Sequence, residues 1–368
     1  MEGIEELYKF APKGEWELPK TIHHLIRVTM TKATEIAAKV HEGQQQKTFE
    51  EMVPMWLHNY RSVFKTEGFD KSFPPCQEWD HKINLVENTQ PWDDMRIIPL
   101  SNKEDKVMQE FITENLWTRQ IHPSKSPFTS PFFFVKKDGK LRPVQDYQKI
   151  NMMTVKNHTP LPLIKEVINQ LCGACIFSKM DVHWGFNNIQ IKEGDEHKAV
   201  FTTSAGLFEP TIMFFVLTNS PATFQMMMNT ILQSIIIEGK VQVYMDDIMV
   251  ATIDKEDHRW TVRKVLQILK ENNLYLKPKK CEFEKEEINY LGVIIGADHI
   301  KVNPIKVVAI QDWPTPRQLV EVQEFMGFLN FYRRFLKNLS KTAQPLYELT
   351  KRRFPSNGPW NVTMHSKP

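Results

Sequence analysis

Two adjacent aspartates lie in a sequence that could form a metal site. Asp246 and Asp247 follow Tyr244 and Met245, and β-prone residues flank the four on both sides. Neighbouring side chains of a continuous strand point to opposite faces, so the two carboxylates can share one site only where the chain reverses. The sequence therefore predicts a β-hairpin with both carboxylates at its tip. Adjacent acids at a turn are also common on ordinary surfaces, so this pair alone is a weak indication.

A third carboxylate, Asp181, strengthens the metal interpretation. It ends the apolar run Phe-Ser-Lys-Met-Asp, which we expect to lie beside the hairpin in an antiparallel sheet. Three clustered carboxylates repel one another unless cations bind them, and Mg²⁺ prefers oxygen ligands. Two such ions about 4 Å apart promote in-line attack of a hydroxyl on a phosphate. The structural alternative is that Asp181 caps a helix or pairs with Lys179.

The elements that must position these residues alternate irregularly between helix and strand. Hairpin signals are frequent, and Ser101 is predicted to cap the first helix. We therefore expect an α+β domain built around an antiparallel sheet. The segments with helical or strand patterns are residues 101–120, 126–147, 161–171, 175–191, 221–236, 240–253, 257–273 and 279–295.

Composition and pattern divide the chain into five segments. Residues 1–50 are predicted to be a polar helical segment of unknown role, and residues 51–99 a lead-in segment rich in Pro, Trp and Asp. Residues 100–303 hold the α+β elements. Residues 304–350 are predicted to be helical, and residues 351–368 form a tail.

The positive charge is concentrated in one part of the chain. Residues 301–353 hold ten Lys and Arg against four Asp and Glu, whereas the whole chain holds 47 against 44. A basic helical surface suits a phosphate backbone, although a solvated helix face has the same composition. No run reaches the roughly 18 apolar residues that a membrane span needs, and the start is acidic, unlike a secretion signal. We expect an intracellular protein, in the cytoplasm, an intracellular particle or the nucleus, that is neither secreted nor bound to a membrane.

Cys172 and Cys175 have the spacing of half a zinc site or a redox pair. No second pair completes a zinc site, and no neighbouring βαβ pattern supports redox chemistry. We interpret them as two small buried thiols at the junction of a helix and a strand.

The order of motifs resembles that of the reverse transcriptases of Ty3/Gypsy-type retrotransposons. The motifs are FSKMDVHWGFNNIQI, GLFEPTIMFFVLTNSPATFQ, VYMDDI, LKPKKCEF and INYLGVII, with SPFTSPFFFVKKDGKLRPVQDYQKIN before them and DWPTPRQLVEVQEFMGFLNFYRRF after them. The resemblance covers roughly residues 50–350. It implies a right-hand polymerase with fingers and palm in residues 100–303, the palm being an antiparallel sheet with helices, and a helical thumb in residues 304–350. It also implies a template of RNA or DNA with a primer, dNTPs as substrates, and two Mg²⁺ ions, with Mn²⁺ as a substitute. No oligomeric state follows from it.

The resemblance also assigns roles around the reaction centre. Three carboxylates match the catalytic, metal-binding triad of the palm: Asp181, Asp246 and Asp247. Three basic residues match those of the fingers hairpin that contact the incoming triphosphate: Lys136, Lys137 and Arg142.

Four further residues are assigned to substrates by the resemblance. Phe186 matches the aromatic gate that excludes a ribose 2′-hydroxyl, although the residue type without the resemblance favours a core aromatic. Gln225 matches a residue near the nucleotide and template. Arg333 and Arg334 lie in the basic thumb-like helices, which would follow the duplex backbone by charge.

Two features depart from the family pattern. Val216 occupies a position that is usually Gly, where a β-branched side chain resists a left-handed backbone or fills space. The tail, residues 351–368, has no acidic cluster of the RNase H kind, and this chain lacks a protease and an integrase. These features favour a second reading, a catalytically silent remnant that at most binds nucleic acid, whereas the intact triad favours an active polymerase. A third reading, an RNA-dependent RNA polymerase, shares the carboxylates but conflicts with the aromatic Phe186.

Overall fold

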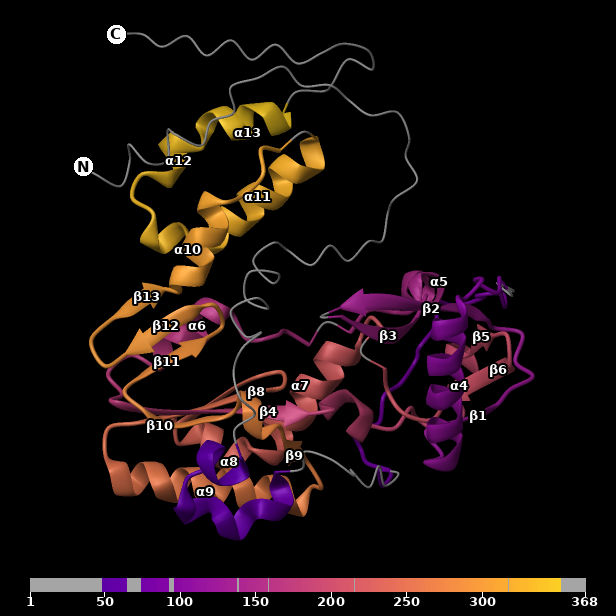
Figure 1. Cartoon of the computed structure of the whole chain (residues 1–368), viewed down its shortest axis with the longest axis horizontal. Coiled ribbons are helices and arrows are strands. Elements are labelled where there is room, and N and C mark those ends of the chain that lie inside the picture. The colour runs from indigo at the N-terminus through magenta and orange to yellow at the C-terminus, as the bar shows by residue number, and fades with distance from the viewer. Residues whose placement is uncertain are drawn as a thin grey trace. The chain divides into compact units, whose positions relative to one another are not determined.

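The computed structural model divides the chain into two compact units, and the division falls between Ile300 and Lys301 (Figure 1). This is three residues before the predicted start of the helical segment at residue 304. Most of the predicted N-terminal segment, and the tail beyond residue 351, lie outside the described residues. The structure describes residues 48–64, 74–92, 96–137, 139–157, 159–214, 216–316 and 318–351.

A five-stranded sheet forms one part of the larger unit, with strand order β1-β6-β5-β2-β3. Neighbouring strands are antiparallel except β2 and β5, which run parallel. Helix α4 (Asn102–Trp117) begins with the predicted cap, because Ser101 and Glu104 form a capping box. Met108 and Ile112 of this helix pack on Phe132 and Phe201 of the sheet. The strands are β1 (Ile121–Pro123), β2 (Ser130–Lys137), β3 (Lys140–Gln145), β5 (Phe201–Thr203) and β6 (Gly206–Pro210).

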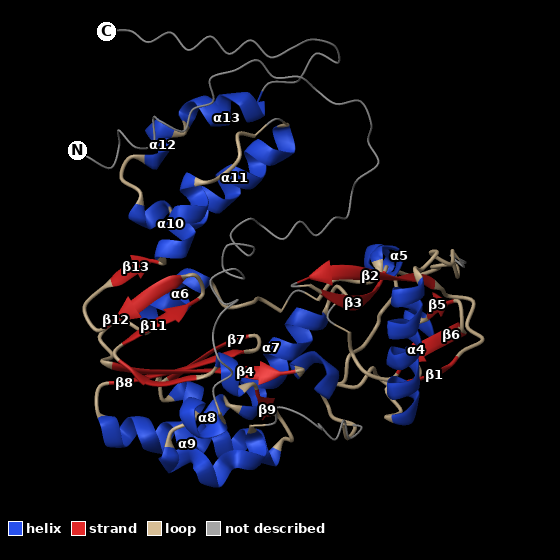
Figure 2. Ribbon diagram, in the orientation of Figure 1, coloured by secondary structure: helices blue, strands red, loops and turns tan. Residues whose placement is uncertain are grey.

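A second sheet carries the predicted aspartates. Its strand order is β10-β4-β8-β7, and β9 also pairs with β4. Figure 2 shows helices α8 and α9 covering one face of this sheet. The strands are β4 (Ile176–His183), β7 (Val241–Tyr244), β8 (Asp247–Thr252), β9 (Tyr275–Leu276) and β10 (Glu282–Lys285).

The core of the larger unit lies between this second sheet and its helices. Phe224 and Met228 of helix α7, Leu266 of helix α9, and Met180 and Ile248 of the sheet belong to one buried cluster. Burial of such side chains stabilises the fold by about 1.5–3 kcal/mol each. The helices are α7 (Ser220–Ile231), α8 (Gln233–Ile237) and α9 (Lys255–Glu271).

The lead-in segment packs on this core. The 3₁₀ helix η1 (Met55–Val63) contributes Leu57 and Val63 to the buried cluster. The ring of Trp56 lies under two guanidinium groups, with Arg259 at 5.3 Å and Arg263 at 5.2 Å from its centroid. These cation–π contacts attach the segment to helix α9.

Short elements complete the larger unit. The strands β11 (Glu287–Tyr290) and β12 (Val293–Gly296) form an antiparallel hairpin, and β13 (Ile300–Val302) follows where the two units divide. The other helices are α3 (Phe49–Met52), α5 (Gln148–Met153), α6 (Ile164–Gln170), η2 (Gly185–Asn188), η3 (Glu196–Ala199) and η4 (Pro278–Lys280).

The described residues of the smaller unit from 304 onward form helices. Its apolar core consists of Val322, Met326 and Leu329 of helix α11 with Leu339 and Ala343. No described helix of the chain is both long and apolar enough to cross a membrane. The helices of this unit are α10 (Pro304–Gln311), α11 (Leu319–Phe331), η5 (Arg333–Phe335), α12 (Leu339–Thr342) and α13 (Gln344–Lys351).

The interpretation of Cys172 and Cys175 as buried thiols is wrong. Both are exposed, and neither forms a disulfide. They lie in the turn between helix α6 and strand β4, where Leu171 and Ala174 supply the buried contacts instead.

Candidate active site

The predicted hairpin is present at the adjacent aspartates. Strands β7 and β8 are antiparallel, and Tyr244 pairs with Asp247, which leaves Met245 and Asp246 as a two-residue turn. Met245 has a φ of 51°, in the left-handed region that such tight turns use. Asp246 lies in the turn and Asp247 begins β8, so both carboxylates are at the same end of the sheet.

The third aspartate is brought to the same place by strand register. Asp181 on β4 lies directly opposite Asp247 on β8. The backbone N–H of Val182 donates to the carbonyl of Asp246 at 2.8 Å, which holds the turn against β4. Asp181 is buried. The three aspartates therefore meet at one end of the sheet, although 66 residues separate the outer two.

Burial and mutual repulsion disfavour a negative charge on all three aspartates at once. Burial raises the pKa of Asp246, and the charges of Asp247 and Asp181 raise it further. Burial also raises the pKa of Asp247, as does the charge of Asp181, although Lys179 opposes the shift. Because like charges directly opposite in a sheet are destabilising, the site needs cations.

Two lysines contact two of the carboxylates. Lys280 Nζ lies 2.7 Å from Asp181 Oδ2, and Lys179 Nζ lies 3.2 Å from Asp247 Oδ1. The alternative pairing of Asp181 with Lys179 is therefore not what the structure contains. Within the described ranges, no three side chains of His, Cys, Asp and Glu are arranged to hold a metal ion. The carboxylates share one end of the sheet, but two of them face ammonium groups.

Further cations surround the aspartates. Burial lowers the pKa of Lys277, and the charges of Lys280, Arg142 and Lys140 lower it further, against Asp181. The β2–β3 hairpin therefore places Arg142 and Lys140 within electrostatic reach of the turn η4. Sequence reasoning assigned no role to Lys277, Lys280 or Lys140, although the motif LKPKKCEF contains the first two.

The other two predicted basic residues of the β2–β3 hairpin are located by the pairing of their backbones. Lys136 is exposed, and its backbone pairs with Leu141. Lys137 ends strand β2 opposite Lys140, and its side chain lies outside the described part of the structure.

Phe186 packs partly on the core, and its role as a gate stays a prediction. Its ring is half-buried and lies 4.8 Å, centroid to centroid, from the ring of buried Phe224. The preceding Gly185 permits this packing, because a Cβ there would lie 2.5 Å from Phe224 Cζ. Phe186 therefore packs on the core through one part of its ring and leaves another part accessible.

Gln225 supports the turn that carries Asp246. Its side chain is fully buried. Oε1 accepts a hydrogen bond from the Met245 N–H at 2.7 Å, and Nε2 donates to the Val243 carbonyl at 3.2 Å and to Asn229 Oδ1 at 2.9 Å. The amide therefore lies beneath the hairpin and hydrogen-bonds to its backbone, and a nucleotide contact by Gln225 stays a prediction.

Val216 carries no left-handed backbone strain. It is absent from the described residues with positive φ, and its carbonyl accepts a hydrogen bond from Asn151 Nδ2 at 2.9 Å. Its side chain is 37% exposed. Valine in place of the usual glycine could cost backbone strain or occupy space that a substrate needs. Only the second cost, the added side-chain volume, applies here.

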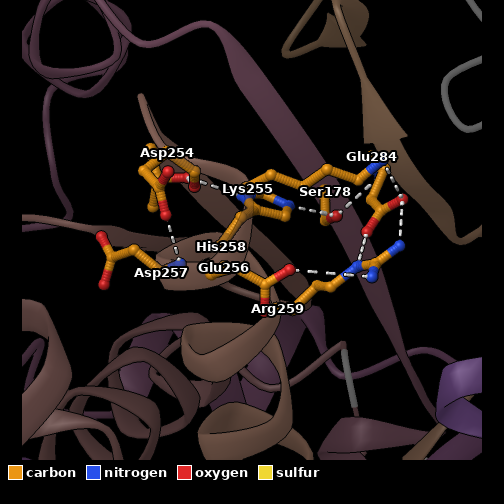
Figure 3. Close-up of polar contacts among 9 residues, drawn as sticks. Ser178, Asp254, Lys255, Glu256, Asp257, His258, Arg259 and Glu284 are labelled. Carbon is orange, nitrogen blue, oxygen red and sulfur yellow. Dashed lines mark hydrogen bonds and ion pairs between the residues drawn. The ribbon is translucent and has the colours of Figure 1, made fainter.

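A buried polar network joins the strands behind the aspartates (Figure 3). Ser178 Oγ accepts from the Glu284 N–H at 3.1 Å and lies 2.7 Å from His258 Nε2, while His258 Nδ1 lies 2.9 Å from Thr252 Oγ1. Burial lowers the pKa of His258 to about 4, so the imidazole is neutral at pH 7. Arg259 binds Glu284 with Nε at 2.5 Å. Ser178 and His258 are fully buried, so the pair holds β4, β8, β10 and α9 together and cannot act as a hydrolytic dyad.

The two predicted arginines of the smaller unit are exposed. Arg333 and Arg334 lie in η5. Arg333 Nη2 donates to Ser340 Oγ at 2.9 Å, and the Arg334 guanidinium lies 5.1 Å from the centroid of the Phe335 ring. Both cationic groups are therefore at the surface of that unit.

Comparisons with known proteins agree with this geometry. The family profile "Reverse transcriptase (RNA-dependent DNA polymerase)" matches residues 134–295. The retrovirus-related Pol polyprotein from transposon 297 of Drosophila melanogaster is 33% identical over 315 residues, which are 84% of this chain and 29% of that protein. The transposon Tf2-3 polyprotein of Schizosaccharomyces pombe is 29% identical over 350 residues, which are 92% of this chain and 26% of that protein. The chain thus spans less than a third of the length of these relatives.

Solved structures show the same fold. A foamy viral protease-reverse transcriptase in complex with RNA/DNA hybrid has a TM-score of 0.71 at 22% identity, covering 95% of this chain and 46% of that one. The same kind of protein in complex with dsDNA has a TM-score of 0.71 at 23% identity, covering 89% and 67%. The predicted α+β polymerase fold is therefore confirmed. Residues 134–295 match the reverse transcriptase family, and the chain is similar to the Pol polyproteins of retrotransposons over most of its length.

Proposed function

We propose that this chain is an RNA-directed DNA polymerase that extends a primer 3′-hydroxyl with dNTPs. The observation that carries the proposal is the register of β4 and β8, which brings Asp181 opposite Asp247 with Asp246 in the adjoining turn. We assign fingers and palm to residues 100–303 and the thumb to residues 304–350. The polymerase relatives and the polymerase fold support this reading.

The aspartates suit the metal ions of such a reaction. Reverse transcriptases as a family use divalent metal ions. Asp181, Asp246 and Asp247 offer carboxylate oxygens, and burial together with the neighbouring aspartate charges raises the pKa of Asp246 and of Asp247, so bound cations would favour their charged forms. We assign two Mg²⁺ ions to them, with Mn²⁺ as a substitute. When bound, such ions would activate the primer hydroxyl and stabilise the leaving pyrophosphate.

The cations around the aspartates suit the other substrates. Lys140, Arg142 and Lys277 lie within electrostatic reach of one another and would bind the triphosphate of a dNTP. Structural neighbours were solved with RNA/DNA hybrid and with dsDNA, and we infer a primer–template of RNA or DNA as the partner here. Arg333 and Arg334 would contact its phosphate backbone.

Primer extension tests the proposed function directly. The full chain should extend oligo(dT) on poly(rA) with dTTP and Mg²⁺, and EDTA should stop the reaction. A chain that binds the primer–template but adds no nucleotide would be the silent remnant instead. Val216 is the residue that favours this second candidate, because its side chain adds volume where the family usually has glycine.

Replacing the proposed gate should relax sugar selection. In Phe186→Val, we expect incorporation of rUTP relative to dTTP to rise on the order of tenfold or more, because the half-buried ring would no longer meet a 2′-hydroxyl. Competition assays with both nucleotides measure this ratio. Phe224→Leu is the control, since it alters the buried ring beneath Phe186 without removing the gate. If Phe186→Val stays active with an unchanged ratio, Phe186 is only a core residue.

Neutralising the two arginines of the smaller unit should weaken binding of the duplex. For the double variant Arg333→Gln, Arg334→Gln, we expect the slope of log K against log salt to fall by up to about two, roughly one per lost phosphate contact. Fluorescence anisotropy with a labelled primer–template measures it, and the loss should not depend on sequence. Lys103→Gln, Lys106→Gln on helix α4 is the charge-matched control. Equal affinity and equal slope in the double variant would remove these arginines from the duplex contact.

A further inference from the structure

The turn that carries Lys280 is fixed directly over Asp181. Strands β9 and β10 both pair with β4, Leu276 opposite Val182 and Glu282 opposite Lys179, and η4 connects them. The N–H of Lys277 donates to the carbonyl of Asp181 at 3.1 Å. The backbone therefore fixes the turn beside Asp181, from which the Lys280 side chain, 54% exposed, reaches the carboxylate.

Lys179 reaches the other carboxylate from the same strand. It lies two residues before Asp181 on β4, so both side chains leave the same face of the sheet. It is paired with Met249 and extends diagonally to Asp247, which is two residues away on β8. The side chains of Lys179 and Asp247 are only 20% and 22% exposed, and that of Asp181 is 10% exposed. Water therefore screens the pair of Lys179 and Asp247 less than it screens surface ion pairs, whereas the pair of Lys280 and Asp181 is buried only on the side of the carboxylate.

We propose that Lys280 and Lys179 are internal counterions that occupy Asp181 and Asp247 until divalent metal ions replace them. The proposal rests on the proposed role of the aspartates as metal ligands. A carboxylate oxygen engaged by an ammonium group has to give up that contact to ligate a metal, so each pair lowers the affinity for metal. Each pair also offsets the repulsion between Asp181 and Asp247, which lie directly opposite one another.

The position of the displaced Lys280 links metal binding to substrate binding. Lys280 ends η4 and Lys277 is the N-cap of η4, so the two lysines belong to one turn. Burial lowers the pKa of Lys277, and the charges of Lys280, Arg142 and Lys140 all lower it further. Once Asp181 ligates a metal ion, Lys280 adds to this group of cations, and a triphosphate becomes its available anionic partner. Metal ions therefore bind weakly alone and more tightly together with a nucleotide.

Binding of Mn²⁺ without nucleotide tests the proposal. Electron paramagnetic resonance counts free Mn²⁺ during titration of the full chain and of Lys280→Gln, Lys179→Gln and Lys279→Gln. Lys279 is the matched control, because it is exposed in the same turn and forms no ion pair with the described residues. We expect roughly three- to tenfold tighter binding for Lys280→Gln and for Lys179→Gln, the effect of removing one partly screened charge, and less than twofold for Lys279→Gln.

A second measurement separates lost counterions from lost structure. In EDTA, Lys280→Gln should melt several degrees below the parental chain, because the buried Asp181 loses its partner, and saturating Mn²⁺ should restore most of the loss. Unchanged or weaker Mn²⁺ binding by both Lys280→Gln and Lys179→Gln overturns the proposal. Primer extension by the parental chain distinguishes failure of the counterion proposal from failure of the proposed function. If the parental chain extends a primer, only the counterion proposal has failed. If it neither extends a primer nor binds Mn²⁺, the proposed function fails as well.

Discussion

Asp246→Asn should fold like the parental chain and extend a primer at least about a hundredfold more slowly. Electrostatic groups that act on the reacting atoms typically contribute 10²–10³-fold in rate. The fold should survive because the pKa of Asp246 is raised, so the folded state already favours the neutral side chain that Asn imitates. The melting temperature in EDTA should therefore stay equal or rise. Single-turnover extension and thermal unfolding measure the two quantities.

The control for this prediction is Asp298→Asn. Asp298 is exposed in the turn between β12 and β13, and the substitution makes the same chemical change outside the proposed site. We expect parental activity from it. Near-parental extension by Asp246→Asn would mean that the turn aspartate is not part of the reaction, whatever its neighbours do.

Local sequence was enough to predict the hairpin and its tip. β-prone residues on both sides of Asp246 and Asp247 determine the strands, and the turn between them has to be short. The cap at Ser101 is equally local, since its partner Glu104 is three residues away. Each of these features depends on a few neighbouring residues, and for that reason the sequence alone predicts it.

The partners of the aspartates depend on strand register, which local patterns do not determine. Lys179 is near Asp181 in sequence, yet it pairs with Asp247, because Lys179 lies opposite Met249 and Asp247 is its diagonal neighbour on the paired strand β8. Lys280 is 99 residues from Asp181 and reaches it only because β9 and β10 both pair with β4. The motif LKPKKCEF is visible in the sequence, but the sequence alone does not predict which carboxylate its lysines contact.

The direction in which a helical side chain points is a second feature that the sequence alone did not predict. Gln225 was predicted to lie near the nucleotide, because its position in the motif order matched such a residue. Helix α7 instead turns it inward, where the hairpin backbone uses both ends of its amide. The interpretation of Cys172 and Cys175 as buried was wrong for a related reason, because their spacing gave no information about which side of the turn faces solvent.

The second large effect is expected from Gln225→Leu, which keeps most of the side-chain volume and removes both polar atoms. The Met245 N–H then loses its acceptor and the Val243 carbonyl loses a donor, at a cost of roughly 1–3 kcal/mol for each polar group left buried. Since Met245 adopts a left-handed conformation, its turn needs support, and Asp246 follows it directly. We therefore expect a lower melting temperature and at least a tenfold lower kcat, from displacement of the carboxylates.

The split between kinetic constants decides whether Gln225 positions the turn or binds a substrate. A residue that acts only through the hairpin should lower kcat and leave the KM for dTTP nearly unchanged, whereas a nucleotide contact should raise the KM. Gln233→Leu, the same substitution at an exposed position of helix α8, is the matched control and should change neither constant. A raised KM with parental kcat would restore the nucleotide contact predicted from sequence. Parental values for both would mean that the turn holds its shape through Val182 and β4 alone.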